Sequence, residues 1–431
     1  MVSSRIGFPP LGCIMQCTAE HRNGASRGAG LISSPFSEVN QQKTNMPACT
    51  HCLPHPAPLL RQGVGGALLA LALLLSFGAG AQDIQVGRSL PLTGPIAGYG
   101  IAKKLGGDAY IERINREGGV RGRKIRLTTI DDRYDAAEAL KNIRTMEGND
   151  VVAMLSLLGV PAVAAAQPVL EQLKLPAVGL TSGAAGVRTP VRRYSFPMRA
   201  SYADEAAAIT QHLTSLNMTR VLVVRQLNPF GASVADTMIA ALDKAGIKPV
   251  ADLPYKVDGS DVKEVVAKMV AVGQVNVVFL AMQSGVAIPL IDSMRNTGTQ
   301  VGADIFSVSA VDTTVLANTL KEKARGVAIS QIVPLNQPTL PLVREYLRDL
   351  KAIEGGTPSF YGLEAYLEAK ILVEGLRRSG ATISRENLVT ALESLGTYDL
   401  GGMYVTYGPG KREGARFVDL TMVSRNGTLV R

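Results

Sequence analysis

The side chains best suited to covalent or metal chemistry are concentrated at the start of the chain. All four cysteines and three of the four histidines lie within the first 55 of 431 residues: Cys13, Cys17, Cys49, Cys52, His21, His51 and His55. Beyond them the chain has no cysteine and one histidine, His212. Zinc sites, thiolate nucleophiles and Ser-His-Asp triads all require such side chains. The composition after residue 55 therefore argues against most classes of enzyme.

Two short patterns could still carry chemistry, and each has a simpler interpretation. Ser260 and Lys263 have the Ser-x-x-Lys spacing of a nucleophile and its base, but Ser260 also precedes an expected helix, as a capping residue does. Cys49-Thr50-His51-Cys52 resembles half of a metal or redox site, but it lies in a segment that we expect to be removed. We predict a protein that is not an enzyme and that holds no cofactor or metal.

An apolar run at residues 63–77 has the character of a secretory signal. An arginine precedes it, and the small residues 79–81 follow it, as at a cleavage site. The run is shorter than the ~20 residues that a helix needs to span a bilayer, and an uncleaved anchor is the alternative. We predict an upstream extension and signal peptide over residues 1–81, cleavage after Ala81, and a periplasmic mature protein. Translation starts at the first methionine or at Met46.

From residue 84 onward, short β-branched or apolar runs alternate with longer segments of helical period. Examples are an expected strand at 84–90, a helix at 101–116 and a strand at 124–130. Such alternation is typical of parallel sheets with helices on both faces, the doubly wound α/β class. The formal net charge of +9 is spread without a basic run, so no nucleic-acid partner is predicted.

The series of strands and helices occurs twice, which predicts two lobes joined by hinge crossovers. We assign residues 82–200 and 331–403 to the first lobe, and residues 201–330 and 404–431 to the second. The chain is expected to end in a hairpin around Gly408-Pro409-Gly410. Open α/β sheets bind ligands at the carboxyl ends of their strands, so two facing lobes would form a cleft that can close by hinge motion.

Several motifs of the mature chain resemble those of type I periplasmic solute-binding proteins, the leucine/isoleucine/valine-binding family of ABC importers. In order they are Leu92-Thr93-Gly94-Pro95, Tyr99-Gly100, the segment 114–125, Asp131-Asp132, Pro229-Phe230-Gly231 and Phe360-Tyr361-Gly362. The resemblance covers residues 83–425. It implies the same two-lobed fold and a ligand-binding role.

In the first lobe the resemblance places ligand contacts in two strand-to-helix loops. One loop contains Leu157 and Leu158, and family members usually carry Ser or Thr where this chain has Leu157 or Val160. The other contains Thr181, Ser182 and Gly183. Tyr99 could close the cleft beneath Phe230, or it could be an exposed tyrosine of a loop. Backbone amides at helix starts, together with hydroxyls, are suitable donors for a small carboxylate.

In the second lobe the resemblance places Phe230 over the ligand, with Gln283 and Ser309 in the wall. Relatives that bind amino acids have a carboxylate where this chain has Ser309. Asp312 could supply the missing charge, or it could cap the helix that starts at Thr313.

Two arginines near the expected interlobe region, Arg199 and Arg225, have two interpretations. They could pair with a second carboxylate of the ligand, or they could be solvated or bridge the lobes.

Together, the signal segment, the two expected lobes and the resemblance predict an exported, monomeric receptor for a small polar metabolite, either an amino acid or a small carboxylate. The expected partner is the permease complex of an ABC importer in the inner membrane. The alternative is a periplasmic ligand sensor of the same fold that feeds a signalling or regulatory partner.

Overall fold

The structure, a computed structural model, describes residues 82–296 and 303–430. All of them lie within one compact unit of the chain, Leu75–Arg431. The predicted signal peptide and the Cys49–Cys52 pattern lie outside the described residues.

The first lobe is built on a parallel sheet of five strands in the order β2-β1-β3-β4-β5. The strands are β1 Ile84–Leu90, β2 Ile125–Asp131, β3 Ala153–Leu158, β4 Ala177–Thr181 and β5 Ser195–Phe196. The helices that connect them are α2 Ala97–Arg116, α3 Ala136–Glu147 and α4 Val160–Leu173, followed by the 3₁₀ turn η2 Ala185–Val187. All residues of β3 and β4 are buried, as expected for strands covered on both faces.

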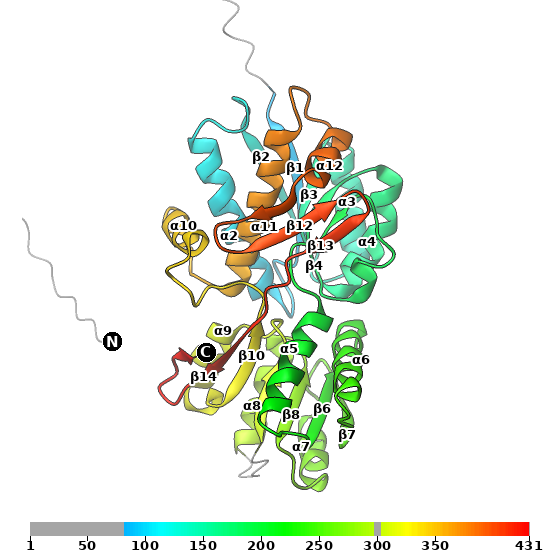
Figure 1. Cartoon of the computed structure of the whole chain (residues 1–431), viewed down its shortest axis with the longest axis vertical. Helices are drawn as coiled ribbons and strands as arrows, with labels where there is room; N and C mark the ends of the chain where they lie inside the picture. The colour runs from blue at the N-terminus through cyan, green and yellow to red at the C-terminus, as the bar shows by residue number, and fades with distance from the viewer. Residues whose placement is uncertain (1–81, 297–302, 431) are drawn as a thin grey trace, which may run out of the picture. The chain divides into compact units, whose positions relative to one another are not determined.

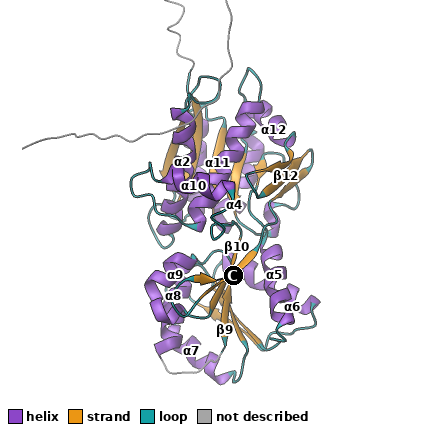
Figure 2. Ribbon diagram, turned by 60° about the vertical axis from the view of Figure 1, so that its left-hand side comes forward, coloured by secondary structure: helices purple, strands orange, loops and turns teal. Residues whose placement is uncertain are grey.

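The second lobe is built on a sheet of seven strands in the order β15-β14-β10-β9-β8-β6-β7. Five run parallel: β6 Val221–Gln226, β7 Ala251–Tyr255, β8 Val277–Ala281, β9 Asp304–Ser307 and β10 Val327–Gln331. Its helices are α5 Tyr202–Ser215, α6 Pro229–Lys244, α7 Val262–Ala271, α8 Ser284–Asn296 and α9 Thr313–Leu320, with the 3₁₀ turn η3 Lys321–Ala324. Figure 2 shows helices on both sides of each large sheet, and the predicted fold class is confirmed.

Three further helices return to the first lobe: α10 Pro341–Leu350, α11 Phe360–Arg378 and α12 Arg385–Glu393. Helix α11 packs along α2 (Figure 1), and both contribute to one large hydrophobic core. The two helices approach closely at Gly106 and Gly362. A Cβ atom on Gly106 would overlap the carbonyl of Gly362, so glycine is required there. This contact brings the polar side chains of α2 and α11 within reach of one another.

The end of the chain differs from the predicted boundary at residue 404. Strands β11 Gly396–Asp399, β12 Tyr404–Gly408 and β13 Lys411–Gly414 form a separate antiparallel sheet. Val405 and Tyr407 pack in the core of the first lobe, and this burial holds residues 404–414 there. Only β14 Asp419–Val423 and β15 Leu429–Val430 join the second sheet, with β14 antiparallel to β10. The predicted hairpin is therefore shorter, and it pairs β12 with β13.

The chain passes between the lobes three times: between β5 and α5, between β10 and α10, and between β13 and β14. The first and third passages lie side by side (Figure 1), because the backbone N–H of Ala415 donates to the carbonyl of Met198 at 2.6 Å. The first passage ends where Ser201 and Asp204 form a capping box that starts α5.

Candidate functional site

The carboxyl ends of the strands in both lobes meet at a seam, and several side chains hydrogen-bond across it. The Tyr361 hydroxyl of α11 donates to the carbonyl of Ala310, which follows β9, at 2.8 Å. Gln283 Nε2, at the end of β8, donates to the Tyr134 hydroxyl at 3.2 Å. The described structure therefore has its two lobes in direct contact at this seam.

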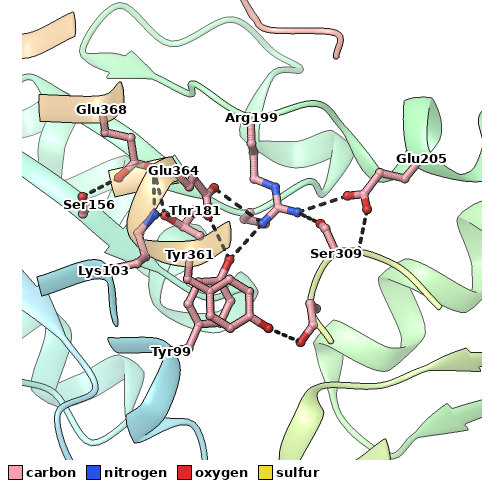
Figure 3. A network of polar contacts seen from close by, with 12 residues as sticks. Tyr99, Lys103, Ser156, Thr181, Arg199, Glu205, Ser309, Tyr361, Glu364 and Glu368 are labelled. Atoms are coloured by element: carbon pink, nitrogen blue, oxygen red, sulfur yellow. Dashed lines mark hydrogen bonds and ion pairs between the residues drawn. The ribbon is translucent and has the colours of Figure 1, made fainter. Parts of the chain in front are cut away.

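A buried ion cluster lies on the first-lobe side of the seam, where α2 meets α11 (Figure 3). Lys103 Nζ lies 3.0 Å from Glu368 Oε1 and 3.3 Å from Glu364 Oε2, and all three side chains are at most 1% exposed. The hydroxyls of Ser156, within β3, and Thr181, at the end of β4, donate to Glu368. Burial raises the pKa of Glu368, whereas the adjacent Lys103 lowers it.

Arg199 extends this cluster across the seam. Its guanidinium donates to the Tyr99 hydroxyl at 3.3 Å and to Glu205 Oε1 at 3.1 Å, and it also donates to the Ser309 hydroxyl. Glu364 lies 3.8 Å away. Arg199 and Glu205 are 2% and 0% exposed. Of its two interpretations, the structure supports the one in which Arg199 bridges the lobes.

Glu205, at the start of α5, connects this bridge to the second sheet. One of its oxygens accepts from the backbone N–H of Ser309 at 2.8 Å and from the Ser330 hydroxyl at 2.6 Å. Arg225, in contrast, pairs with Asp252 of β7 and Asp236 of α6, and these two carboxylates are 35% and 68% exposed. The two arginines that the sequence treated alike therefore have different environments. We call the set Lys103, Arg199, Glu205, Glu364 and Glu368 the buried polar network.

The predicted site residues of the first lobe are buried, and most of their polar groups have partners within the protein. The Thr181 hydroxyl bonds Glu368, and the Ser182 hydroxyl accepts from the N–H of Ala184 at 3.3 Å. A Cβ atom on Gly183 would overlap the Tyr202 ring, so this loop packs against the start of α5. Leu157 packs in a core cluster behind the sheet.

Leu158 belongs to a small apolar cluster at the seam together with Leu90, Ile96, Tyr99 and Tyr361. The rings of Tyr99 and Tyr361 are stacked, with centroids 3.4 Å apart.

The predicted residues of the second lobe are divided between core and seam. Phe230 is 2% exposed and packs edge-on against Tyr202 in a core cluster that also contacts Val160 of the first lobe. Ser309 belongs to the Arg199 bridge, whereas Gln283 faces a cavity described below. No structural observation tests whether any of these residues contacts a ligand, and those assignments stay predictions.

A cavity of about 470 Å³ lies at the seam beside the stacked tyrosines. The first lobe contributes Tyr99, Tyr361, Ile101 and Leu105, and the second contributes the starts of α8 and α9. Most of the lining is apolar, and the volume falls within the range of small-molecule sites. We call this space the interlobe cavity. Two of the nine predicted site residues, Tyr99 and Gln283, line it.

Asp312 is the charged side chain among the described residues that line the interlobe cavity. It is 2% exposed and caps α9, since its Oδ1 accepts from the backbone N–H groups of Thr314 and Val315 at 2.8 and 2.9 Å. Burial raises the pKa of Asp312, and these two backbone donors lower it. The capping interpretation of Asp312 is thus confirmed.

Sequence reasoning missed Lys103, Glu364 and Glu368, although the sequence held a signal. Glu364 and Glu368 are spaced i, i+4 on a helix whose other residues are mostly apolar and buried. Lys103 follows Tyr99 by four residues on α2, so both lie on the same helix face. Charged residues on a buried helix face need partners, which could have indicated a buried cluster.

Asp132, near the seam, gives a prediction for stability as a function of pH. It is 1% exposed, it accepts from the Ser89 hydroxyl at 2.8 Å, and its burial raises its pKa to about 6. The carboxyl of Asp132 keeps its proton to a higher pH in the folded state than in the unfolded state. As the pH rises from about 4 to about 6, this group should therefore lower the free energy of unfolding by about 2 to 3 kcal/mol. Asp132→Asn should remove that part of the slope in urea unfolding curves measured across the range. If the free energy of unfolding depended on pH equally in the parent and in Asp132→Asn, this role of Asp132 would be contradicted.

A family model described as "Periplasmic binding protein" matches residues 83–427. The chain belongs to the periplasmic binding protein family. This match covers both lobes and all three passages, so the resemblance drawn from the motifs is confirmed. As the family consists of solute-binding proteins without catalytic activity, the prediction that the chain is not an enzyme is also confirmed.

Individual relatives support this placement of the periplasmic binding protein. The Leu/Ile/Val-binding protein homolog 3 of Brucella melitensis is 24% identical over 334 residues, which cover 75% of this chain and 87% of the relative. A substrate-binding periplasmic protein from Ralstonia solanacearum has a TM-score of 0.76 and 29% identity, covering 81% of this chain and 99% of that one. A possible leucine/isoleucine/valine-binding protein from Rhodopirellula baltica has a TM-score of 0.75 and 26% identity, covering 82% and 97%.

Within residues 82–296 and 303–430, no helix combines the length and the apolar character needed to cross a bilayer.

Proposed function

We propose that this periplasmic binding protein is exported, captures a small solute in the interlobe cavity as a monomer, and presents the closed form to an ABC importer. One observation carries the proposal: the cavity has walls from both lobes, so an occupant would contact both and favour their closure. The names of the relatives, Leu/Ile/Val-binding and amino acid binding proteins, support an amino acid or a similar small solute.

Hydrogen bonds between the lobes at the seam stabilise the closed form, and solute capture involves no covalent chemistry. Tyr361 reaches Ala310, and Gln283 reaches Tyr134, so each lobe supplies hydrogen-bond partners for the other. A solute that adds contacts to both walls would shift the equilibrium toward this arrangement by its differential affinity for it. The import step requires that the partner permease recognise the closed form.

Thermal unfolding with a panel of amino acids, amines, carboxylates and neutral amides tests solute capture. A solute at 100 times its dissociation constant should add ~2.7 kcal/mol to the free energy of unfolding. X-ray scattering with the same solute should show a more compact protein than without it. If no solute in the panel produces either effect, capture of a small solute is contradicted.

Filling the cavity tests its location. Val315 lines the cavity and is 47% exposed, so Val315→Trp should occupy the space at little cost to folding and abolish the stabilisation by the solute. Val270→Trp is the matched control, because Val270 is 45% exposed on α7 and does not line the cavity. Unchanged solute binding by Val315→Trp would exclude the interlobe cavity as the site.

A further inference from the structure

The charge pattern of the interlobe cavity restricts the chemistry of its occupant. Among the described lining residues, no lysine, arginine or histidine is present, and Asp312 carries the one charge. Both capping bonds of Asp312 end on Oδ1. Among the described residues, none donates a hydrogen bond to its other carboxylate oxygen, Oδ2. No described lysine or arginine forms an ion pair with Asp312 either, although its side chain is almost fully buried.

The helices around the cavity explain how Asp312 can stay ionised there. Four helices begin at its walls, namely α2, α8, α9 and α11, and their amino ends carry partial positive charge. This charge favours the ionised form of Asp312. A second carboxylate, brought in by a solute, would stand beside Asp312 without a cationic side chain in the described lining to compensate it.

The remaining walls suit an apolar body next to a cation. Ile101, Leu105, Ile288 and Val315 supply aliphatic surface. The stacked pair of Tyr99 and Tyr361 adds aromatic rings, whose faces attract cations.

We infer that the interlobe cavity selects a solute with a protonated amine on an apolar body, that Asp312 pairs with this amine, and that a free carboxylate on the solute is not required. The inference rests on the proposed function, since it specifies the solute class of the same cavity. It assigns the role of ammonium partner to Asp312, because the chain has Ser309 at the position where relatives that bind amino acids carry a carboxylate. An ammonium that becomes buried in the cavity needs such a partner, because burial of an unpaired charge is costly.

Four probes with the same branched carbon skeleton separate the contributions. They are 3-methylbutylamine, which is cationic, 3-methylbutan-1-ol, which is neutral, 4-methylpentanoate, which is anionic, and L-leucine, which carries both charges. A charged hydrogen bond contributes about 1.5 to 3 kcal/mol, so the amine should bind roughly 10- to 100-fold more tightly than the alcohol. The anion should bind more weakly than the alcohol, and calorimetry of the intact protein measures all four.

Asp312→Asn tests the assigned residue without removing the helix cap, because asparagine caps helices as well as aspartate does. The variant should lose at least ~10-fold in affinity for the amine and change little toward the alcohol. The matched control is Asp135→Asn, since Asp135 caps α3 in the same way at an exposed position. Both variants should melt close to the parent protein, and Asp135→Asn should bind all probes as the parent does.

Three results would overturn the inference. They are tighter binding of 4-methylpentanoate than of the amine, binding of L-leucine with neither the amine nor the alcohol bound, and equal amine affinity in Asp312→Asn. In each of these cases a solute still binds, so the proposed function would survive. Failure of every solute in the wider panel, in contrast, would contradict the proposed function itself.

Discussion

Replacing Arg199 with leucine is expected to lower the free energy of unfolding by about 3 to 5 kcal/mol, because it leaves buried carboxylates without their cation. Glu205 is completely buried, and its oxygen Oε1 bonds the Arg199 guanidinium. Ser309 and Ser330 still donate to the other oxygen, but hydroxyl and amide donors do not neutralise the charge. Urea unfolding at neutral pH measures the loss.

A second arginine gives the control for this experiment. Arg225→Leu removes a guanidinium that also pairs with two carboxylates, but those carboxylates, Asp236 and Asp252, are 68% and 35% exposed. Exposed ion pairs contribute about 0 to 1 kcal/mol, so this variant should be nearly as stable as the parent. The double variant Arg199→Leu/Glu205→Gln should recover part of the loss, since it removes the unpaired charge. If Arg199→Leu and Arg225→Leu lowered the free energy of unfolding by similar amounts, burial of the Arg199 ion pairs would not account for the loss.

Replacing Lys103 with methionine should destabilise the protein to a similar extent, by about 3 to 5 kcal/mol at neutral pH. Methionine has a comparable length, so the packing between α2 and α11 is kept while two buried carboxylates, Glu364 and Glu368, lose their nearest cation. Lys104→Met is the control from the next position. Lys104 is 41% exposed and pairs with Asp108 one turn further on, a pair worth ~0.5 kcal/mol.

The loss in Lys103→Met should depend on pH in a direction that follows from Glu368. Burial already raises the pKa of Glu368, and removal of Lys103 takes away the charge that lowers it. A carboxyl group with a folded-state pKa above its unfolded value gains stability as pH falls, because the folded protein then binds the extra proton. The stability difference from the parent should therefore shrink as the pH is lowered from neutral, and Lys103→Met/Glu368→Gln should restore part of the lost stability at neutral pH. A difference that grows on acidification would refute this account.

Much of the fold could be predicted from the sequence, because local patterns determine it. The alternation of buried strands with amphipathic helices indicated the doubly wound class, and the strand expected at residues 84–90 coincides with β1. The last strands were assigned less well. Residues 404–414 are short strands whose neighbours are chosen by packing, with Tyr407 inserted into the core of the first lobe, and periodicity contains no information on that choice.

The site was harder to predict than the fold, because its contacts join residues far apart in sequence. Lys103 and Glu368 are separated by 265 positions, and only the close crossing of α2 and α11 brings them together. The motifs pointed to strand ends that lie near the seam, such as Thr181 at the end of β4. They could not show that the hydroxyl of Thr181 would be engaged by Glu368, or that Phe230 would be enclosed by Tyr202 and Val160.

The backbone bond between Met198 and Ala415 has a mechanical consequence. This bond joins the first and the third of the three passages between the lobes, so a movement of one passage is transmitted to the other. A change in the direction of one passage would therefore strain this bond unless the other passage turned with it. An opening of the two lobes that keeps this bond would have to bend both passages together, which reduces the number of directions in which the lobes can separate.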